Sequence, residues 1–559
     1  MEEKEKKDIT ISLEELSESK PVECLGEVCC ADTGPPSSVI TLKIRGRPDD
    51  LRLGQPLIIE TEKLLYYTLI MRLYYPSNEL AERLANSPFT GLLPPPQIEG
   101  VRGKEFYGLA DLGCLRILPS KSIEELEYQE LMRQFDTIPP IFSIGRDASE
   151  EEFQIIYKTT EYSDPIGKLR GFNYDVPIDF KLLVEKPYGL FGRTGIGKSI
   201  LNKILCLYIL KHNVSQLLLF DMQGEYGLIS RSDKTKGLAY YFQERIQIYF
   251  LGEIDKKNKV IDGSEQLIIY KDNILSGDII ASAQNLNEPS INTLILIENL
   301  LNDKILHYDN LIDAINNIKT AEVQEHRLNN LSLGALRNRI IPFERYNFLK
   351  KRGDSKREDS IEHMFKKLLE GKSIVIDFGK YGTNTHLYLF VANMITRRLY
   401  RMYSQREDET LPPLVVIVEE AHKFLKSQII RHTIFDSIAR ETRKFQLTLA
   451  FVDQRPSQID EEVYSQIANT FVMHMNDDKD IKRVIQTLPD SKKWGGIISG
   501  LQKRQCFARG DALAVASVVD VLNYKDEKLM KKLLGIKKPL SETLKTIEDS
   551  DLTSLGNNR

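Results

Sequence analysis

A glycine-rich segment, GRTGIGKS at positions 192–199, constrains the fold of this chain more than any other feature. It fits the pattern GxxxxGK[ST], follows a short apolar stretch at 188–191 and precedes SILNKILCLYILK, whose composition is typical of a helix. A phosphate-binding loop of this type connects a strand to a helix. The segment therefore predicts a nucleotide-binding domain with alternating strands and helices.

The chemistry of this loop follows from its residue types. Glycines let the backbone wrap around a phosphate group, and N–H groups at the start of a helix present positive potential. Lys198 is expected to place its charge on the β- and γ-phosphates, and the hydroxyl of Ser199 to ligate Mg²⁺. No guanine-selecting NKxD-type stretch is found, which favours ATP over GTP. We predict that ATP is bound by the loop and the first helical residues: Gly192, Arg193, Thr194, Gly195, Ile196, Gly197, Lys198, Ser199 and Ile200.

The rest of the chain after about residue 181 supports an α/β core. Nearly continuous apolar runs alternate there with helical stretches: VSQLLLFD, KSIVIDFG, PPLVVIVEEAH and QLTLAFVDQ. Such runs are typical of parallel strands that are covered on both faces. We predict a mostly parallel core over 181–520 with a long, mostly helical insertion at about 230–370, followed by a helix and a polar tail at 521–559.

The first 120 residues are predicted to form a small β-barrel-like domain. Their segments are rich in β-branched and aromatic residues and are bounded by turn-forming stretches such as DTGPP and GRPDD. A closed barrel has no open sheet edges, so it is a rigid module suited to docking a partner or a neighbouring subunit. Residues 121–180 are predicted to be a connector that contains one helical stretch, IEELEYQELMRQF.

Composition limits the classes of partner and the location. The 559 residues include 76 Lys and Arg against 80 Asp and Glu, so a uniformly basic nucleic-acid binder is excluded and any such contact must be local. The six cysteines are scattered without metal-ligand spacing, so reduced thiols in a cytoplasmic protein are expected. The charged N-terminus argues against a secretory signal, and the shortness of the apolar runs argues against a membrane span.

Two adjacent carboxylates end one of the buried strands, in PPLVVIVEEAHKF. Their burial is costly unless a cation lies nearby. Glu419 is expected to lie in the shell of Mg²⁺, and Glu420 to polarise a water molecule for in-line attack on the γ-phosphate. By itself the pair also fits a strand that runs into a solvated helix start, where the helix dipole favours Glu.

A third polar group lies in IARETRKFQLTLAFVDQRPSQID. Arg440 and Arg443 share one face of a predicted helix, and each fits either a solvated surface or an arginine that completes a neighbouring subunit's site. Gln454 follows the next strand at its carboxyl end, where ligands of α/β sheets bind, and is expected to sense the γ-phosphate. The predicted catalytic residues are therefore Glu420, Arg440, Arg443 and Gln454.

In combination, these motifs resemble the HerA family of hexameric DNA-translocating ATPases, within the wider HerA/FtsK group. The resemblance rests on the glycine-rich loop, FDMQGEYG at 220–227, VVIVEEAHKF and IARETRKF with DQRPSQID, in this order over about 181–515. It implies a RecA-like P-loop ATPase core in a homo-hexamer, with ATP at subunit boundaries and double-stranded DNA in a central pore. It also implies a partner, either a nuclease of the NurA type or, as in some bacterial relatives, an effector of phage defence.

The resemblance also bears on single residues. It implies the roles given above for the loop, for Glu419 and Glu420 and for Gln454, with Arg440 or Arg443 reaching a neighbour's nucleotide. Three residues fall on the family's Asp-x-x-Gly-Glu-Tyr stretch, where a carboxylate near the γ-phosphate is expected: Asp221, Gly224 and Glu225. The sequence departs from the family pattern at Thr442 and Gln446, where Gly is usual, and at Asp453, where Ser is frequent.

Three functions fit these observations. The favoured one is an ATP-driven translocase of double-stranded DNA that works as a ring. A DNA-transfer motor of the FtsK or conjugative type shares the predicted fold, and an NTP-dependent scaffold that assembles an effector would keep the nucleotide site without pumping DNA. Some basic residues fit DNA contact and structural roles alike: Arg397, Arg398, Arg401 and the stretch KKRGDSKREDS.

Overall fold

The computed structural model describes residues 24–32, 39–45, 48–76, 107–119, 137–252, 264–283, 286–354, 357–405, 411–425, 430, 433–486 and 491–536. The chain divides into two compact units. The barrel unit comprises 1–156, 170–174 and 485–500, and the sheet unit comprises 157–169, 175–484 and 501–559, each within the described ranges.

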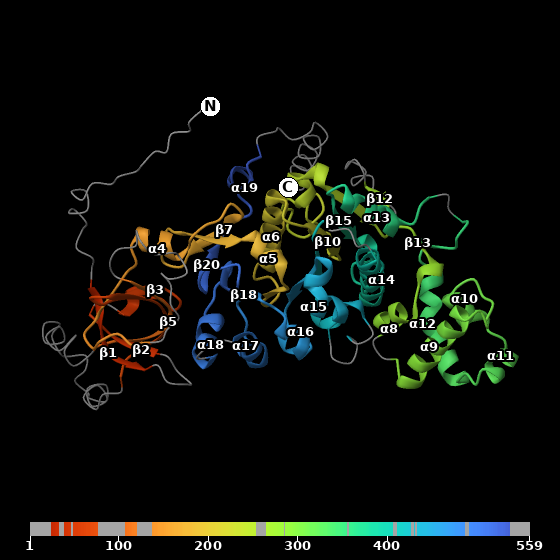
Figure 1. Cartoon of the computed structure of the whole chain (residues 1–559), viewed down its shortest axis with the longest axis horizontal. Helices are drawn as coiled ribbons and strands as arrows, with labels where there is room; N and C mark the ends of the chain where they lie inside the picture. The colour runs from red at the N-terminus through yellow and green to blue at the C-terminus, as the bar shows by residue number, and fades with distance from the viewer. Residues whose placement is uncertain are drawn as a thin grey trace, which may run out of the picture. The chain divides into compact units, whose positions relative to one another are not determined.

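Six antiparallel strands close into a barrel in the order β1-β2-β5-β4-β3-β6, drawn in red and orange in Figure 1. The strands are β1 (Cys24–Asp32), β2 (Val39–Ile44), β3 (Pro56–Glu60), β4 (Leu64–Tyr74), β5 (Leu109–Pro119) and β6 (Ile144–Arg146). Alternate side chains of β2 are buried, as expected of a barrel strand with one face inward. The interior is filled by apolar residues that include Ile40, Leu42, Leu57 and Tyr66.

The strand that closes the barrel, β6, lies beyond residue 120, in the stretch that the sequence assigned to a connector. Arg146 holds this strand, because its Nε donates to Glu60 at 2.5 Å and its Nη atoms donate to Glu152 of α4 (Glu150–Ile156) at 2.7 and 2.9 Å. Helix α18 (Ser491–Ser499) belongs to the same unit and packs against β4. The helix predicted in IEELEYQELMRQF lies outside the described residues.

The sheet unit is built on a twelve-stranded sheet with the order β12-β11-β15-β10-β16-β17-β9-β18-β19-β20-β7-β8. Neighbours from β12 to β18 are parallel, and those from β18 to β8 are antiparallel. Every residue of β10 and of β17 is buried, so both faces of the sheet are covered there. The strands are β7 (Ser163–Leu169), β8 (Asp175–Asp179), β9 (Tyr188–Phe191), β10 (Gln216–Asp221), β11 (Ile246–Phe250), β12 (Glu265–Gln266), β15 (Ser373–Asp377), β16 (Leu414–Glu419), β17 (Leu447–Asp453), β18 (Asn469–Met473), β19 (Gln505–Arg509) and β20 (Ser517–Val521).

Helices connect these strands, as the alternating sequence pattern predicts. They are α5 (Phe180–Glu185), α6 (Lys198–His212), α7 (Leu238–Tyr241), α8 (Ser276–Ser282), α9 (Glu288–Asn302), α10 (Leu311–Asn317), α11 (Thr320–Glu325), α12 (Asn330–Glu344), α13 (Ser360–Leu369), α14 (Thr385–Ser404), α15 (Ile434–Phe445), α16 (Glu461–Ser465), α17 (Asp478–Ile485) and α19 (Glu527–Leu533). None of the helices in the described ranges is long and apolar enough to cross a membrane.

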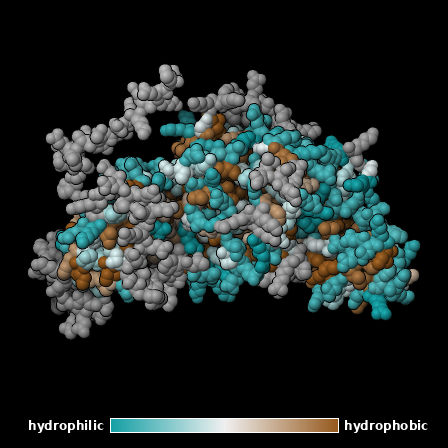
Figure 2. Space-filling model, viewed as in Figure 1, coloured by the Kyte–Doolittle hydropathy of each residue, from teal (hydrophilic) through white to brown (hydrophobic). Residues whose placement is uncertain are grey.

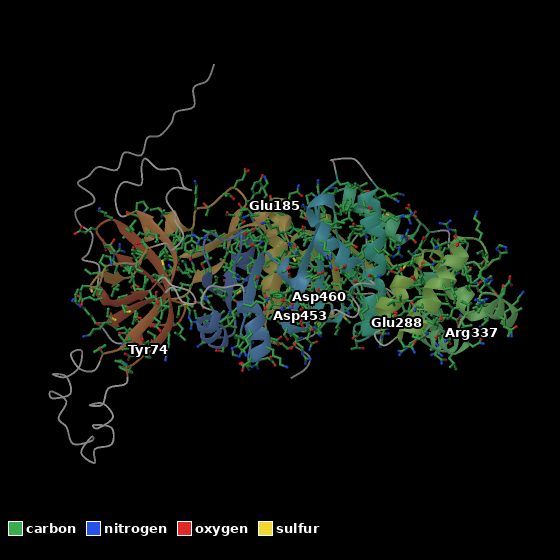
Figure 3. The ribbon with its side chains drawn as sticks, turned by 60° about the horizontal axis from the view of Figure 1, so that its bottom comes forward. Tyr74, Glu185, Glu288, Arg337, Asp453 and Asp460 are labelled. Atoms are coloured by element: carbon green, nitrogen blue, oxygen red, sulfur yellow. The ribbon has the colours of Figure 1, made fainter. Side chains whose placement is uncertain are left out.

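The helical insertion consists of α8 to α12, the green group of Figure 1, and lies in the chain between the paired short strands β13 (Ile269–Tyr270) and β14 (Leu349–Lys350). Figure 3 labels Glu288 in α9 and Arg337 in α12. Apolar side chains of these two helices are exposed (Leu296, Leu331 and Ile341), and Figure 2 shows brown areas over this group. The range 230–370 also contains β11, a strand of the main sheet.

The predicted fold class is confirmed. The core is an α/β sheet that is parallel in its larger part and carries a helical insertion, and a small β-barrel precedes it. The apolar runs that indicated buried parallel strands correspond to β10, β15, β16 and β17.

Candidate active site

The predicted phosphate loop lies between β9 and α6, at the edge of the sheet where the parallel strands end. The carboxyl ends of β10, β16 and β17 meet at the same edge, because these strands are parallel neighbours of one another and of β9. Gly195 and Gly197 have φ angles of 76° and 121°, which residues with a Cβ rarely adopt. Glycine is therefore needed at these positions for the loop to turn into the helix.

Lys198 points back over the loop. Its Nζ donates to the backbone oxygens of Gly192 at 2.7 Å and Arg193 at 3.1 Å. Burial lowers the pKa of Lys198, although the carboxylates of Glu420 and Asp453 act in the opposite direction. The ammonium is thus held inside the loop, where a phosphate group bound by the backbone would meet it.

The loop opens into a cavity of about 660 Å³. The predicted site residues that line it are Thr194, Gly195, Gly197, Lys198, Ser199, Ile200, Glu419, Glu420 and Gln454. The structure thus brings the phosphate loop together with two motifs that lie more than 200 positions further along the chain. Gly192, Arg193 and Ile196 belong to the loop but are not among the lining residues.

Glu419 is the last residue of β16, and its carboxylate receives a hydrogen bond from a neutral group. The Oη of Tyr226 donates to its Oε1 at 2.7 Å, and the amide of Asn202 donates to that Oη at 2.9 Å. The pKa of Glu419 is raised to about 8. Burial is the main cause and the charges of Asp221 and Glu225 add to it, whereas the hydrogen bond from Tyr226 acts in the opposite direction. A carboxylate in this state is one that a bound cation would stabilise.

Glu420 follows in a strained backbone conformation with a φ angle of 52°. The Nε2 of Gln454 donates to its Oε1 at 2.8 Å, and the Oγ1 of Thr194 donates to the Oε1 of Gln454 at 2.6 Å. A continuous chain of hydrogen bonds therefore joins the phosphate loop, the residue predicted to sense the γ-phosphate and the predicted base.

Asp453, labelled in Figure 3, holds the backbone next to Gln454 and Glu420 in place. Its buried carboxylate accepts from the backbone N–H groups of Gln454 and Arg455 at 2.5 and 2.6 Å, and from the backbone N–H of His422. The Nδ1 of His422 lies 3.0 Å from the same carboxylate. A serine hydroxyl at this position would accept fewer of these bonds, so the structure gives a physical reason for the aspartate.

Gln446, the second departure from the resemblance, also has a structural account. It ends α15 with a φ angle of 55°, in the left-handed region where glycine is favoured. The backbone thus adopts the turn that a glycine would form. Thr442 lies in α15, and its side chain is outside the described part of the structure.

The Asp-x-x-Gly-Glu-Tyr stretch forms a tight loop after β10. The buried carboxylate of Asp221 accepts from the N–H groups of Glu225 and Tyr226, each at 2.8 Å, and Gly224 has a φ angle of 67°. Burial and the neighbouring charge of Asp377 raise the pKa of Asp221 to about 6. Asp221 thus shapes the loop, while Glu225 is the carboxylate of this stretch that lines the cavity.

The sequence reasoning did not identify several further lining residues: Lys203, Lys503, Arg504, Asn523, Tyr524 and Lys525. Lys203 is only 1% exposed, and its Nζ donates to Thr235 at 2.8 Å. Burial lowers its pKa, against the opposing charges of Asp233 and Glu225. A lysine in the interior of the mostly apolar run SILNKILCLYILK was the available signal for Lys203.

The two arginines of α15 do not both have a described position. Arg440 is exposed, pairs with Asp436 at 3.1 Å and with Glu462, and is not among the residues that line the cavity. Arg443 lies in α15, and its side chain is outside the described part of the structure.

Other basic residues have structural roles. Arg397 is paired with the buried Asp278 at 2.7 Å, and Arg398 with the buried Asp359 at 2.7 Å, so neither guanidinium is presented for DNA. In the basic stretch, Lys351 lies 3.8 Å from the carboxylate of Asp309, and Arg352 lies 3.6 Å from that of Asp272. Lys356 of that stretch lies outside the described residues.

Mg²⁺ fits the residues at the head of the cavity. Ser199 and Glu419 both line it, and the Glu419 carboxylate accepts a hydrogen bond from the neutral hydroxyl of Tyr226. Among the described residues, no group of three or more His, Cys, Asp or Glu side chains is arranged to hold a metal ion. An ion held by a hydroxyl, a carboxylate and nucleotide oxygens needs no such group.

Comparison with known proteins relates the central part of the chain to the HerA helicases. Residues 164–399 match the family model described as "Helicase HerA, central domain". The chain is a distant homologue of the HerA helicases. It is 24% identical over 431 residues to the DNA double-strand break repair helicase HerA of Sulfolobus acidocaldarius, covering 74% of this chain and 79% of that protein. It is also 24% identical to the protein of that name from Pyrococcus furiosus, covering 68% and 72%. The chain is therefore an ATPase whose central part, residues 164–399, is similar to the central domain of HerA helicases.

Solved structures give weaker matches. The plasmid coupling protein TrwB in complex with the ATP analogue ADPNP is 13% identical, with a TM-score of 0.45 over 68% of this chain and 93% of that one. VirB4 of Thermoanaerobacter pseudethanolicus is 12% identical, with a TM-score of 0.45 over 65% and 98%.

Proposed function

We propose that this HerA-type ATPase is a motor that couples ATP hydrolysis to the translocation or unwinding of double-stranded DNA. The observation that carries the proposal is a single cavity that holds the phosphate loop, the carboxylates that end β16 and a glutamine after β17. The relatives named as DNA double-strand break repair helicases support DNA as the polymer that is moved.

The motif residues that line the cavity then have roles in hydrolysis. The backbone of the loop and Lys198 bind the β- and γ-phosphates, and Ser199 and Glu419 hold Mg²⁺, which would neutralise charge on the phosphates. Glu420 accepts a proton from the attacking water, because its carboxylate stands beside the loop and is oriented by Gln454. Gln454 is bonded to Thr194 of the loop, so it is placed to respond to the γ-phosphate.

A homo-hexameric ring is the assembly that fits this function. Arg440 does not line the cavity of its own chain. Its helix, α15, packs against β17, the strand next to β16. We infer that Arg440 or Arg443 extends to the nucleotide of a neighbouring subunit, where an arginine in trans accelerates phosphoryl transfer by about 10³–10⁵. The partner that uses the moved DNA would be a nuclease of the NurA type or another effector, including one that acts in phage defence.

ATP turnover with and without long duplex DNA tests the proposal. If the proposal is right, ATP turnover is expected to rise several-fold with duplex DNA, and mass measurement with ATP and Mg²⁺ is expected to give a six-membered assembly. A scaffold, by contrast, would respond to its partner protein and ignore DNA. If turnover is unaffected by duplex DNA of any length while the hexamer forms, the motor function is wrong.

Mixing two inactive variants tests the arginine in trans. Lys198→Ala subunits and Arg443→Ala subunits are expected to regain partial turnover when co-assembled, because some boundaries then combine an intact loop with an intact arginine. The same mixture made with Arg440→Ala in place of Arg443→Ala distinguishes the two arginines. Failure of both mixtures to regain turnover, with co-assembly verified, would contradict the role.

A further inference from the structure

The cavity extends beyond the phosphate loop to two segments from the last part of the described chain. Lys503 and Arg504 form the turn before β19, and Asn523, Tyr524 and Lys525 follow β20. These strands form an antiparallel hairpin in which Gln505 pairs with Asp520, so the start of β19 and the end of β20 lie side by side. The motifs identified from the sequence account for none of these five residues.

The turn at Arg504 is joined directly to the phosphate loop. Its backbone N–H donates to the oxygen of Ile196 at 3.3 Å, and its own carbonyl oxygen accepts from Val521 at 2.8 Å. Arg504 has a φ angle of 65°, which costs a non-glycine residue free energy and persists where the surroundings impose it. The side chain is exposed toward the cavity, and its Nη1 donates to the Oδ1 of Asn523 at 3.3 Å.

Contacts of Tyr524 hold this part of the cavity lining in place. Tyr524 is 3% exposed, and its Oη donates to the backbone oxygen of Lys236 at 2.7 Å. The Nζ of Lys203, on α6 beyond the loop, lies 5.6 Å from the centre of its ring. Asn523 therefore stands on a segment anchored by a buried tyrosine, next to an arginine anchored on the loop.

The charged lining residues come from different elements. The carboxylates Glu225, Glu419 and Glu420 lie at or just after the ends of β10 and β16, whereas the cations Lys503, Arg504 and Lys525 flank the strands of the hairpin. The loop and the carboxylates together account for the triphosphate and its cation. The sugar and base then need a site beyond Ile200, past the first residues of α6, where the hairpin residues complete the cavity wall.

We propose that Arg504 and Asn523 bind the sugar and base of the nucleotide within the same subunit. This rests on the proposed nucleotide site and names its second half. A guanidinium offers a flat cation for the face of a base or for ribose hydroxyls, and a carboxamide offers a donor and an acceptor for polar edge atoms. The hydrogen bond between the two side chains keeps them close together, and contacts with the bound nucleotide would replace this bond.

Equilibrium binding of two probes tests the proposal, a non-hydrolysable ATP analogue and inorganic tripolyphosphate, both with Mg²⁺. Arg504→Ala and Asn523→Ala are expected to weaken binding of the analogue about tenfold or more and to change tripolyphosphate binding less than twofold. Such a factor is the usual cost of losing one or two polar contacts. Lys198→Ala is expected to weaken both probes, and Lys528→Ala, which removes an exposed cation of α19 outside the cavity, neither.

Arg504→Gly gives a variant in which misfolding cannot imitate the effect. Glycine adopts a φ angle of 65° without strain, so this change removes the guanidinium while relieving the turn. It is expected to match Arg504→Ala in analogue binding, with a thermal midpoint no lower than that of the parent.

Three results would overturn the inference. Unchanged analogue binding in Arg504→Gly and Asn523→Ala, with binding lost in Lys198→Ala, would refute the sugar-base site and leave the nucleotide site intact. Equal weakening of both probes would assign the two residues to the phosphates or to support of the loop. Retained binding in Lys198→Ala would refute the nucleotide site itself.

Discussion

Two carboxylates in the sheet unit, the buried Asp278 and the half-buried Glu419, have opposite surroundings. Asp278, at the start of the helical insertion, accepts from Arg397 at 2.7 and 3.1 Å and from Asn393 at 2.8 Å. Glu419, at the cavity, accepts from the neutral hydroxyl of Tyr226, and the described residues place no lysine or arginine within 4 Å of it. The first carboxylate is neutralised by the fold, whereas burial raises the pKa of the second to about 8.

The difference separates structural charge from functional charge. A buried carboxylate that is fully paired costs little further free energy and holds two segments together. A buried carboxylate without a cationic partner destabilises the free protein, and this cost is recovered only when a ligand supplies the charge. Unpaired acids at a strand end are therefore the better guide to the active site than acids in general.

The largest expected effect is on turnover. Glu420→Gln removes the base and keeps the side chain's size, so ATP turnover is expected to fall about 10²–10⁴-fold while the affinity for ATP is retained. Steady-state hydrolysis and equilibrium binding measure the two quantities. Glu325→Gln, an exposed change in α11, serves as the control and is expected to leave both unchanged. Retained turnover in Glu420→Gln would remove the assignment of the base.

The next effect is on stability and concerns the paired group. Arg397→Met leaves Asp278 buried without its cation, so the free energy of unfolding is expected to fall by about 3–5 kcal/mol. Denaturant unfolding measures it, with Arg401→Met, an exposed change on the same helix, as the control. The double variant Arg397→Met, Asp278→Asn is expected to lose less than Arg397→Met alone. A loss under about 1 kcal/mol in the single variant would show that Asp278 does not depend on Arg397 for its neutralisation.

The unpaired group should respond in the opposite direction. Glu419→Gln removes a charge that desolvation disfavours, so without nucleotide or metal the protein is expected to become more stable by about 1–2 kcal/mol at pH 8.5, above the raised pKa of the carboxyl group. Thermal unfolding in the presence of a chelator measures this gain. The same variant is expected to bind the Mg²⁺ form of the ATP analogue more weakly. Lower stability in the free protein would indicate that Glu419 is structural.

The smallest effect tests pairing in the barrel unit. Burial alone would raise the pKa of Glu152, but hydrogen bonds from Arg146 and from the N–H of Ser149 outweigh it and hold the pKa below its ordinary value. Glu152 therefore stabilises the fold above its unfolded-state pKa, and this contribution is lost as the pH falls through the folded-state pKa.

Glu152→Gln is accordingly expected to cost about 1 kcal/mol at pH 7 and almost nothing near pH 2. Chemical unfolding at the two pH values measures the difference, and Glu150→Gln, an exposed change at the start of the same helix, is the control. An equal cost at both pH values would show that the loss comes from packing and not from charge.

Local sequence determined a large part of this protein. The glycines and Lys198 define a loop whose geometry depends on neighbouring residues alone, and apolar runs define strands that must be buried on both faces. Because parallel strands end at one edge of a sheet, the sequence also predicted that Glu419 and Glu420 would lie near the loop, and the structure places all three motifs around one cavity.

Only the tertiary structure decided which carboxylates have a cationic partner, because Arg397 and Asp278 are 119 positions apart and carry no shared motif. The same holds for the barrel strand β6 and for the β19–β20 hairpin at the cavity. These strands are short and carry no sequence motif that would assign them to the barrel or to the cavity. Contacts between distant segments depend on how the elements pack, and the local pattern of a chain does not encode that packing.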